Sequence, residues 1–198
     1  WVIEDRFAAA RPAWESAGAT LVREIEPFET MKLRLLNGSH STLAYLGFLA
    51  GHEFIWQAST DPLLATLIER LMAEEVLPTL AAPPGVDLGA YCAKLVERFR
   101  NPALPHRTQQ IAMDGSQKLP QRLLGTVRDR LGAGGSVRHL TLAVAGWIRY
   151  ASGTDERGNA IDVQDPLADE FRQVVRDAGG DPGPIADGFL DLLSVFGT

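Results

Sequence analysis

Apolar residues recur along most of this chain at intervals of three and four positions, the spacing of an α-helix that buries one face. The pattern is clearest over 62–77, where Asp61 and Pro62 are typical of a helix start. Over 138–151 the apolar positions occupy nearly the whole circumference, which is typical of a central, buried helix. Both segments predict a helical core.

Further helices are predicted by the same spacing together with proline or aspartate near a beginning and glycine or proline beyond an end. They cover residues 28–50, 87–99, 105–114, 119–131, 165–175 and 185–196. A short helical turn is expected at 11–18, and extended structure only at 1–3 and, ambiguously, at 21–25. With about eight helices and no internal repeat, residues 1–198 are predicted to form one all-α domain.

Composition narrows the classes of protein that fit. The 198 residues are 45% hydrophobic and 22% charged, which are ordinary values for a globular domain. A formal net charge of -6 without a cluster of Lys or Arg argues against nucleic acid and anionic membranes as partners. No apolar run approaches the roughly 18 residues that span a bilayer. The single Cys92 cannot form an internal disulfide, so a cytoplasmic protein is expected.

The segment 32–40 combines an amine, an amide and an imidazole with large apolar side chains. On an α-helix, which turns about 100° per residue, His40 lies about 80° and Asn37 about 140° from Lys32, so the three groups share one largely apolar side. Such groups need partners, which a substrate can supply. An ordinary lysine amine is protonated at neutral pH, and apolar surroundings would make it available as a base. The pattern alone leaves this site and a helix with internally paired polar groups equally open.

A second polar cluster lies at 114–122, where an Asp-Gly-Ser turn precedes Lys118 and Arg122. It is interpreted as a capped junction between helices or, alternatively, as a clamp for an anion or a hydroxyl. The glycine-rich turn at 132–136 has no preceding strand and no phosphate-binding spacing, so a helix terminator is expected there. The adjacent Glu74 and Glu75 are expected on a solvated helix face. No His, Cys or carboxylate spacing is typical of a metal site, and none is expected.

Several motifs follow one another in a recognisable order. They are Trp-Val-Ile-Glu-Asp at 1–5, the K-x4-N-x2-H spacing of Lys32, Asn37 and His40, Tyr-Leu-Gly at 45–47, Arg-Phe-x-Asn-Pro at 98–102 and Asp-Gly-Ser-x-Lys at 114–118. In this order they resemble the C-terminal domain of the mannitol dehydrogenase family, the polyol-specific long-chain dehydrogenases, over most of the chain. The runs 106–108 and 111–122 look most like those of the fructuronate reductases, also called mannonate oxidoreductases.

The resemblance implies a two-domain enzyme in which an N-terminal Rossmann domain binds NAD and this helical domain carries the catalytic helix. Lys32 would be the general base, Asn37 would donate a hydrogen bond to the developing alkoxide, and His40 would orient the substrate hydroxyl. Lys118 would bind further along the sugar chain. The carboxylate of a uronate or aldonate would be bound by one of Lys118, Arg122, His106 and Arg107.

One departure bears on the substrate. Polyol-oxidising members of the family carry an arginine eight residues before the Lys118 equivalent, where this chain has Gln110. A ketouronate and an aldonate, such as fructuronate and mannonate, are therefore expected as substrates. The alternatives are a polyol dehydrogenase domain of the mannitol or arabinitol type and a non-catalytic helical interaction or dimerisation domain, for which the helix at 138–151 would be either the monomer core or the interface.

The start of the chain also bears on its context. It opens at Trp1 without an initiator Met and without a charged and then apolar leader. We therefore expect the back part of a longer protein, inactive without its NAD domain, in which the choice between NAD and NADP lies in the other half.

Overall fold

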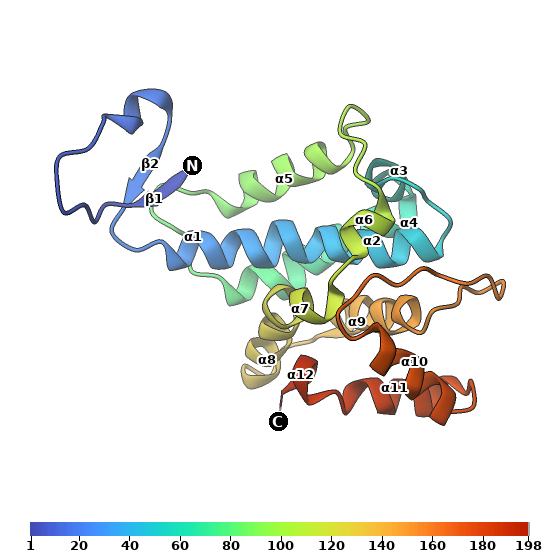
Figure 1. Cartoon of the computed structure of the whole chain (residues 1–198). Helices are drawn as coiled ribbons and strands as arrows, with labels where there is room; N and C mark the ends of the chain where they lie inside the picture. Colours follow the sequence, from blue (N-terminus) through green and yellow to red (C-terminus); the bar gives the residue numbers. More distant parts are fainter. Residues whose placement is uncertain (198) are drawn as a thin grey trace.

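The fold is built around one long helical rod. In the computed structural model, which describes residues 1–197, helix α1 (Glu26–Met31), the π-helical segment η2 (Lys32–Gly38) and helix α2 (Ser39–Leu49) follow one another without a break. Figure 1 shows this rod crossing the middle of the molecule. It begins with a proline in the first turn, where the missing N–H costs nothing. It ends before Gly51, whose φ of 89° is left-handed and suits glycine.

Shorter helices surround the rod. Helices α3 (Ile55–Thr60), α6 (Thr108–Ala112) and α9 (Arg138–Ala151) pack directly against α2. Helix α5 (Leu88–Phe99) lies above the rod in Figure 1, and α9 lies below it. The remaining elements are α4 (Pro62–Arg70), π-helical η3 (Leu71–Val76), the 3-10 turn η4 (Leu77–Thr79), α7 (Gly115–Leu119), π-helical η5 (Pro120–Leu124), α8 (Gly125–Gly132), α10 (Ala168–Asp177), α11 (Pro182–Leu190) and α12 (Leu193–Phe196).

The all-α class predicted from the sequence is confirmed, and so are its clearest helix starts. The Asp61 carboxylate accepts the N–H groups of Leu63 and Leu64 at 2.9 and 3.2 Å at the start of α4. At the start of α5, the Asp87 carboxylate accepts the N–H of Ala90 at 3.0 Å. These bonds satisfy N–H groups that have no partner within their helix. Among residues 1–197, no helix is both long enough and apolar enough to cross a bilayer.

The first part of the chain forms a small arm that contains the only sheet of the described residues. Strands β1 (Val2–Glu4) and β2 (Thr20–Val22) pair in parallel, with Ile3 opposite Leu21. The predicted turn between them is the 3-10 helix η1 (Trp14–Ala17). Figure 1 shows the arm projecting from the helical body. The segment that was ambiguous in the sequence is therefore a strand, and its partner is the predicted extended start of the chain.

The core lies where the rod meets α9. Leu35, Leu43 and Tyr45 of the rod are fully buried together with Trp147 of α9, and each such side chain contributes roughly 2 kcal/mol by leaving water. The Trp147 ring also contacts the edge of the Phe171 ring at a centroid distance of 5.6 Å, which fixes α10 to α9. The apolar helix predicted at 138–151 therefore has its predicted bounds and forms the core of this chain.

The predicted helices at 28–50, 62–77 and 119–131 are each interrupted by a π-helical segment, η2, η3 and η5 respectively. The chain therefore divides into more helical elements than the eight that were expected. One interruption has a local cause, because Pro120 has no N–H to donate to the carbonyl four residues earlier. The interruption at η2 changes the relative directions of Lys32, Asn37 and His40, because the angles calculated from the sequence assumed a regular α-helix.

Candidate functional site

A partly enclosed cavity of about 160 Å³ lies between the rod, α3, α5 and the loop that follows α5. Two of its polar residues, Asn37 and His40, come from the rod, and two more, Arg98 and His106, come from the opposite wall. Apolar side chains make up the rest: Leu36, Ile55, Phe99 and Leu104. A small cavity with a few convergent polar groups in an apolar wall is typical of a ligand site.

The π-helical segment η2 brings Lys32 and Asn37 into line. In a π-helix the repeating hydrogen bond joins residues five apart, and Asn37 is the fifth residue after Lys32. In the α-helix assumed from the sequence, the two would be about 140° apart. Lys32 does not line the cavity; it is exposed and makes no ion pair or hydrogen bond within residues 1–197, so its amine is free to meet a ligand. The segment therefore presents an amine and an amide on one face.

Four side-chain polar atoms of the rod are buried without a hydrogen-bond partner among the described residues, and two of them belong to residues that line the cavity. These two are the side-chain oxygen of Asn37 and Nε2 of His40. The His40 ring is stacked on the Phe99 ring at a centroid distance of 5.3 Å and lies 5.5 Å from the His106 ring. A buried polar atom without a partner costs about 1 to 3 kcal/mol, and a ligand hydroxyl, which can both donate and accept a hydrogen bond, would recover this cost.

Positive charge surrounds His40. Burial, and then the nearby cations, lower the pKa of His40 from 6.5 to about 4, so its imidazole is neutral at neutral pH. Besides the neighbouring His106 ring, the groups that act on it are the positively charged Arg122, Arg98 and Lys118. The site is therefore positive in a chain whose net charge is -6. Such a site favours an anionic ligand.

Lys118 and Arg122 lie near the rod but are already partly engaged. The Lys118 ammonium donates to the Met113 carbonyl and lies 3.8 Å from the Asp114 carboxylate. The Arg122 guanidinium donates to the Ser41 hydroxyl at 3.0 Å. Burial, followed by the charge of Arg122, lowers the pKa of Lys118. Burial also lowers the pKa of Arg122. Both cations contribute to the positive field of the site, although neither lines the cavity.

A glycine sets the distance between these cations and the rod. A Cβ at Gly38 would lie 2.7 Å from the backbone carbonyl oxygen of Arg122, so no larger residue fits without moving one of the two segments. Gly38 ends η2, and Arg122 lies in η5. The close packing of these two π-helical segments therefore depends on the absence of a side chain at position 38.

His106 and Arg107 are adjacent but point to different surroundings. The carbonyl of His106 accepts the N–H of Ile55 at 2.9 Å, which holds its loop against the start of α3. The Arg107 guanidinium instead forms an ion pair with Glu53 at 2.5 Å and lies over the Phe54 ring, outside the cavity lining. Of these two predicted site residues, the structure places His106 in the cavity with Asn37 and His40 and leaves Arg107 apart.

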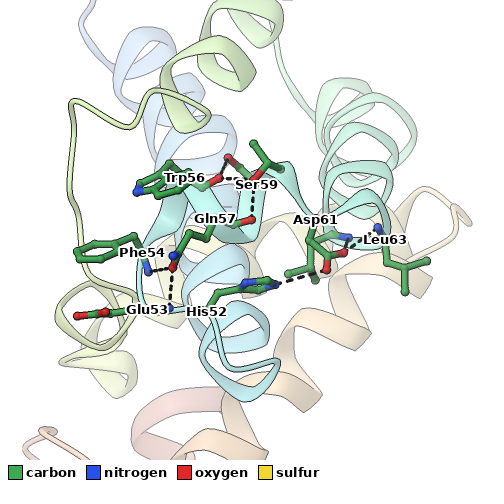
Figure 2. Close-up of polar contacts among 10 residues, drawn as sticks. His52, Glu53, Phe54, Trp56, Gln57, Ser59, Asp61 and Leu63 are labelled. Atoms are coloured by element: carbon green, nitrogen blue, oxygen red, sulfur yellow. Dashed lines mark hydrogen bonds and ion pairs between the residues drawn. The ribbon is translucent and has the colours of Figure 1, made fainter.

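The turn between α2 and α4 supports this wall of the cavity. Figure 2 shows the Gln57 side chain turned back to Glu53 and Phe54, whose N–H groups it accepts at 3.0 and 2.9 Å. The same view shows His52 next to Asp61, with Nε2 at 3.4 Å from the carboxylate. These contacts fix the start of α3, and Ile55 of that helix lines the cavity.

The Asp-Gly-Ser turn at 114–116 has a structural explanation. Asp114 has a left-handed φ of 55°, which is uncommon outside glycine but tolerated by aspartate. A Cβ at Gly115 would lie 2.3 Å from Nε1 of Trp147, so only glycine fits against this ring. The Ser116 hydroxyl and N–H donate to Asp165 at 2.6 and 2.8 Å. The turn is the junction between helices that the sequence indicated, and it sets the direction of Lys118.

Sequence reasoning gave no role to two residues that the structure makes important. Arg98 was quoted only within a motif, because periodicity does not show which neighbour each face of α5 meets. Glu75 was expected on a solvated face, and this was wrong: its side chain is buried and accepts the N–H groups of His139 and Leu140 at 2.9 and 2.8 Å. It therefore caps α9, and it does not line the cavity.

Within residues 1–197, no group of three or more His, Cys, Asp or Glu could hold a metal ion.

Comparisons with known proteins agree with this arrangement. The family described as the mannitol dehydrogenase C-terminal domain matches residues 24–185. D-mannonate oxidoreductase of Escherichia coli is 59% identical over 174 residues, which cover 88% of this chain and 36% of that protein. Mannitol 2-dehydrogenase of Aspergillus fumigatus is 38% identical over 200 residues, which cover all of this chain and 39% of that protein. The chain thus spans less than half the length of these curated relatives.

A solved structure gives the same result. Mannitol 2-dehydrogenase of Pseudomonas fluorescens, in a ternary complex with NAD and D-mannitol, superimposes with a TM-score of 0.91 at 37% identity. The match covers all of this chain and 39% of that protein. With the family matched over most of its residues and the fold superimposed over all of them, this chain belongs to the mannitol dehydrogenase C-terminal domain family.

Proposed function

We propose that this chain is the substrate-binding and catalytic domain of an NAD-dependent oxidoreductase that interconverts a ketouronate, such as fructuronate, and an aldonate, such as mannonate. The main support is the cavity, which combines unpartnered Asn37 and His40 atoms with three nearby cations, Arg98, Lys118 and Arg122. The similarity to D-mannonate oxidoreductase supports the same substrate class. The remaining domain of the intact protein, of Rossmann type, would bind NAD, and no residue of this chain is assigned to the cofactor.

The proposed chemistry is a reversible hydride transfer, and NAD supplies the hydride donor or acceptor. In reduction, hydride adds to the ketone carbon, the electron pair of the C=O bond moves to oxygen, and the Lys32 ammonium gives that oxygen a proton. The amide N–H of Asn37 donates to the same oxygen and stabilises the negative charge that develops there. In oxidation, the neutral Lys32 amine removes the hydroxyl proton as hydride leaves carbon.

His40 has a different role in this proposal. Its neutral imidazole can donate a hydrogen bond through one nitrogen and accept one through the other. Because His40 lines the cavity and its Nε2 has no partner, it would orient a substrate hydroxyl beside the reacting carbon. Because the imidazole adds no charge at neutral pH, it serves as a positioning group and leaves proton transfer to Lys32.

Two other functions remain as alternatives. A polyol dehydrogenase is favoured by the similarity to mannitol 2-dehydrogenase, solved with D-mannitol, since Asn37 and His40 suit a hydroxyl equally well. A non-catalytic helical interaction domain would keep the fold without the reaction. We place the protein in the cytoplasm, on the basis of its single Cys92.

Oxidation of NADH by the full-length protein separates these functions. The assay compares fructuronate, tagaturonate, fructose and xylulose by kcat/KM. Our proposal expects a ketouronate to have the highest value. Reduction of the neutral ketoses alone would support the polyol alternative, and reduction of none of the four would favour the interaction domain.

A further inference from the structure

Arg98 differs from Lys118 and Arg122, the other two cations that act on His40, in having no partner. It lies in the last turn of α5 and lines the cavity wall opposite the rod. Within residues 1–197, its guanidinium makes no hydrogen bond or ion pair. Lys118 and Arg122 bind the Met113 carbonyl and the Ser41 hydroxyl instead. An arginine fork without a counter-ion, at the wall of a positive cavity, is available to a ligand.

His106 lies in the same wall and also has a free side chain. Its loop is held by its backbone, whose carbonyl accepts from Ile55 and whose N–H donates to Leu104 at 2.8 Å, so the ring needs no side-chain bond to stay in place. The ring lies 5.5 Å from that of His40. A group bound between Arg98 and His106 would therefore lie beside the residue that is proposed to orient the substrate.

The chemistry of this pair favours a carboxylate over a hydroxyl. The Arg and Lys groups that act on His40, which are Arg122, Arg98 and Lys118, are all positive, so an anion in the cavity is attracted by each of them. A carboxylate offers two oxygens that match the two N–H groups of the arginine fork, with an imidazole N–H as a further donor. A hydroxyl would leave the guanidinium charge uncompensated.

We propose that Arg98 and His106 form the carboxylate-binding end of the cavity, where they hold the acid group of an open-chain sugar acid. This inference rests on the proposed function, because it assigns the acid group of the proposed substrate to named residues. It also makes Arg98, and not Arg107 or Lys118, the main source of preference for a sugar acid over a neutral sugar.

The test compares R98Q with a matched control at the C-cap of the same helix in the full-length protein. Arg100 lies two residues further along, pairs with Glu69 at 3.2 Å and does not line this cavity. R98Q should raise the KM for fructuronate by about 10-fold to 100-fold, the loss expected for a charge-assisted hydrogen bond, and should change the KM for fructose by less than about threefold. R100Q should leave both within about threefold. R98K, which keeps the charge and loses the fork, should show an intermediate effect.

The outcomes separate this inference from the proposed function. Equal losses on fructuronate and fructose in R98Q, or no loss beyond that of R100Q, would overturn the carboxylate site while leaving the reaction in place. If the unaltered protein reduces neither substrate, the proposed function fails, and calorimetric titration with mannonate and with mannitol decides the inference alone. Tighter binding of mannonate that is lost in R98Q and kept in R100Q supports it, and any other binding result contradicts it.

Discussion

Acid should destabilise the folded chain through His40. The pKa of this imidazole is about 4 when folded, against 6.5 for an ordinary histidine. Between these two values the unfolded chain binds a proton that the folded chain does not, so the free energy of unfolding falls as pH falls. Each pH unit of this window is equivalent to about 1.4 kcal/mol. The loss should therefore approach about 3 kcal/mol between neutral pH and pH 4, as an upper bound.

Urea denaturation of the unaltered chain and of H40N at neutral pH and at about pH 4.5 measures this loss. The carboxylates and the remaining histidines titrate in both proteins. The difference between their losses of unfolding free energy therefore isolates the contribution of His40. We expect H40N to lose about 2 kcal/mol less than the unaltered chain. Equal losses would show that His40 accepts a proton in the folded state, and would refute the assignment of a neutral, desolvated imidazole.

Two further substitutions test the packing that supports the site, each by its urea midpoint against a neighbouring control. G38A should cost about 1 to 3 kcal/mol, because its Cβ would meet the Arg122 carbonyl oxygen at 2.7 Å. G125A, whose Cβ would meet its neighbours at 3.6 Å, should be neutral or slightly stabilising, and a similar loss in both would contradict the contact. E75Q should cost about 2 kcal/mol by weakening the cap of α9, whereas E74Q, with a side chain 57% exposed, should change stability by less than about 0.5 kcal/mol.

The parts of the fold that were predicted correctly have strong local signals. Asp61 and Asp87 precede their helices and accept the N–H groups expected of caps. The helix Arg138–Ala151 follows a glycine-rich turn, so its position follows from the sequence; its burial was predicted in part, because Trp147 and Tyr150 are buried whereas Leu142 and Ala145 face solvent. Helix α3 was not predicted, because its six residues are too few to show a helical period.

The parts that were missed depend on tertiary contacts. A π-helical insertion such as η2 leaves the spacing of apolar residues nearly unchanged, so periodicity does not distinguish it from an α-helix. Asn37, His40 and His106 were expected at the site and line one cavity. Arg98 was missed and Arg107 was expected there, because the direction in which the loop after α5 folds back decides which of these arginines meets the cavity.

The central claim, that Lys32 transfers the proton during hydride transfer, is tested most directly by K32M in the full-length protein. We expect kcat for ketouronate reduction to fall by at least about 100-fold, the usual contribution of a general acid or base, while the Kd for NADH stays within about twofold. K94M, which changes an exposed lysine of α5, serves as the control and should keep full activity. If K32M kept more than half of the activity of K94M, Lys32 would have no part in the reaction.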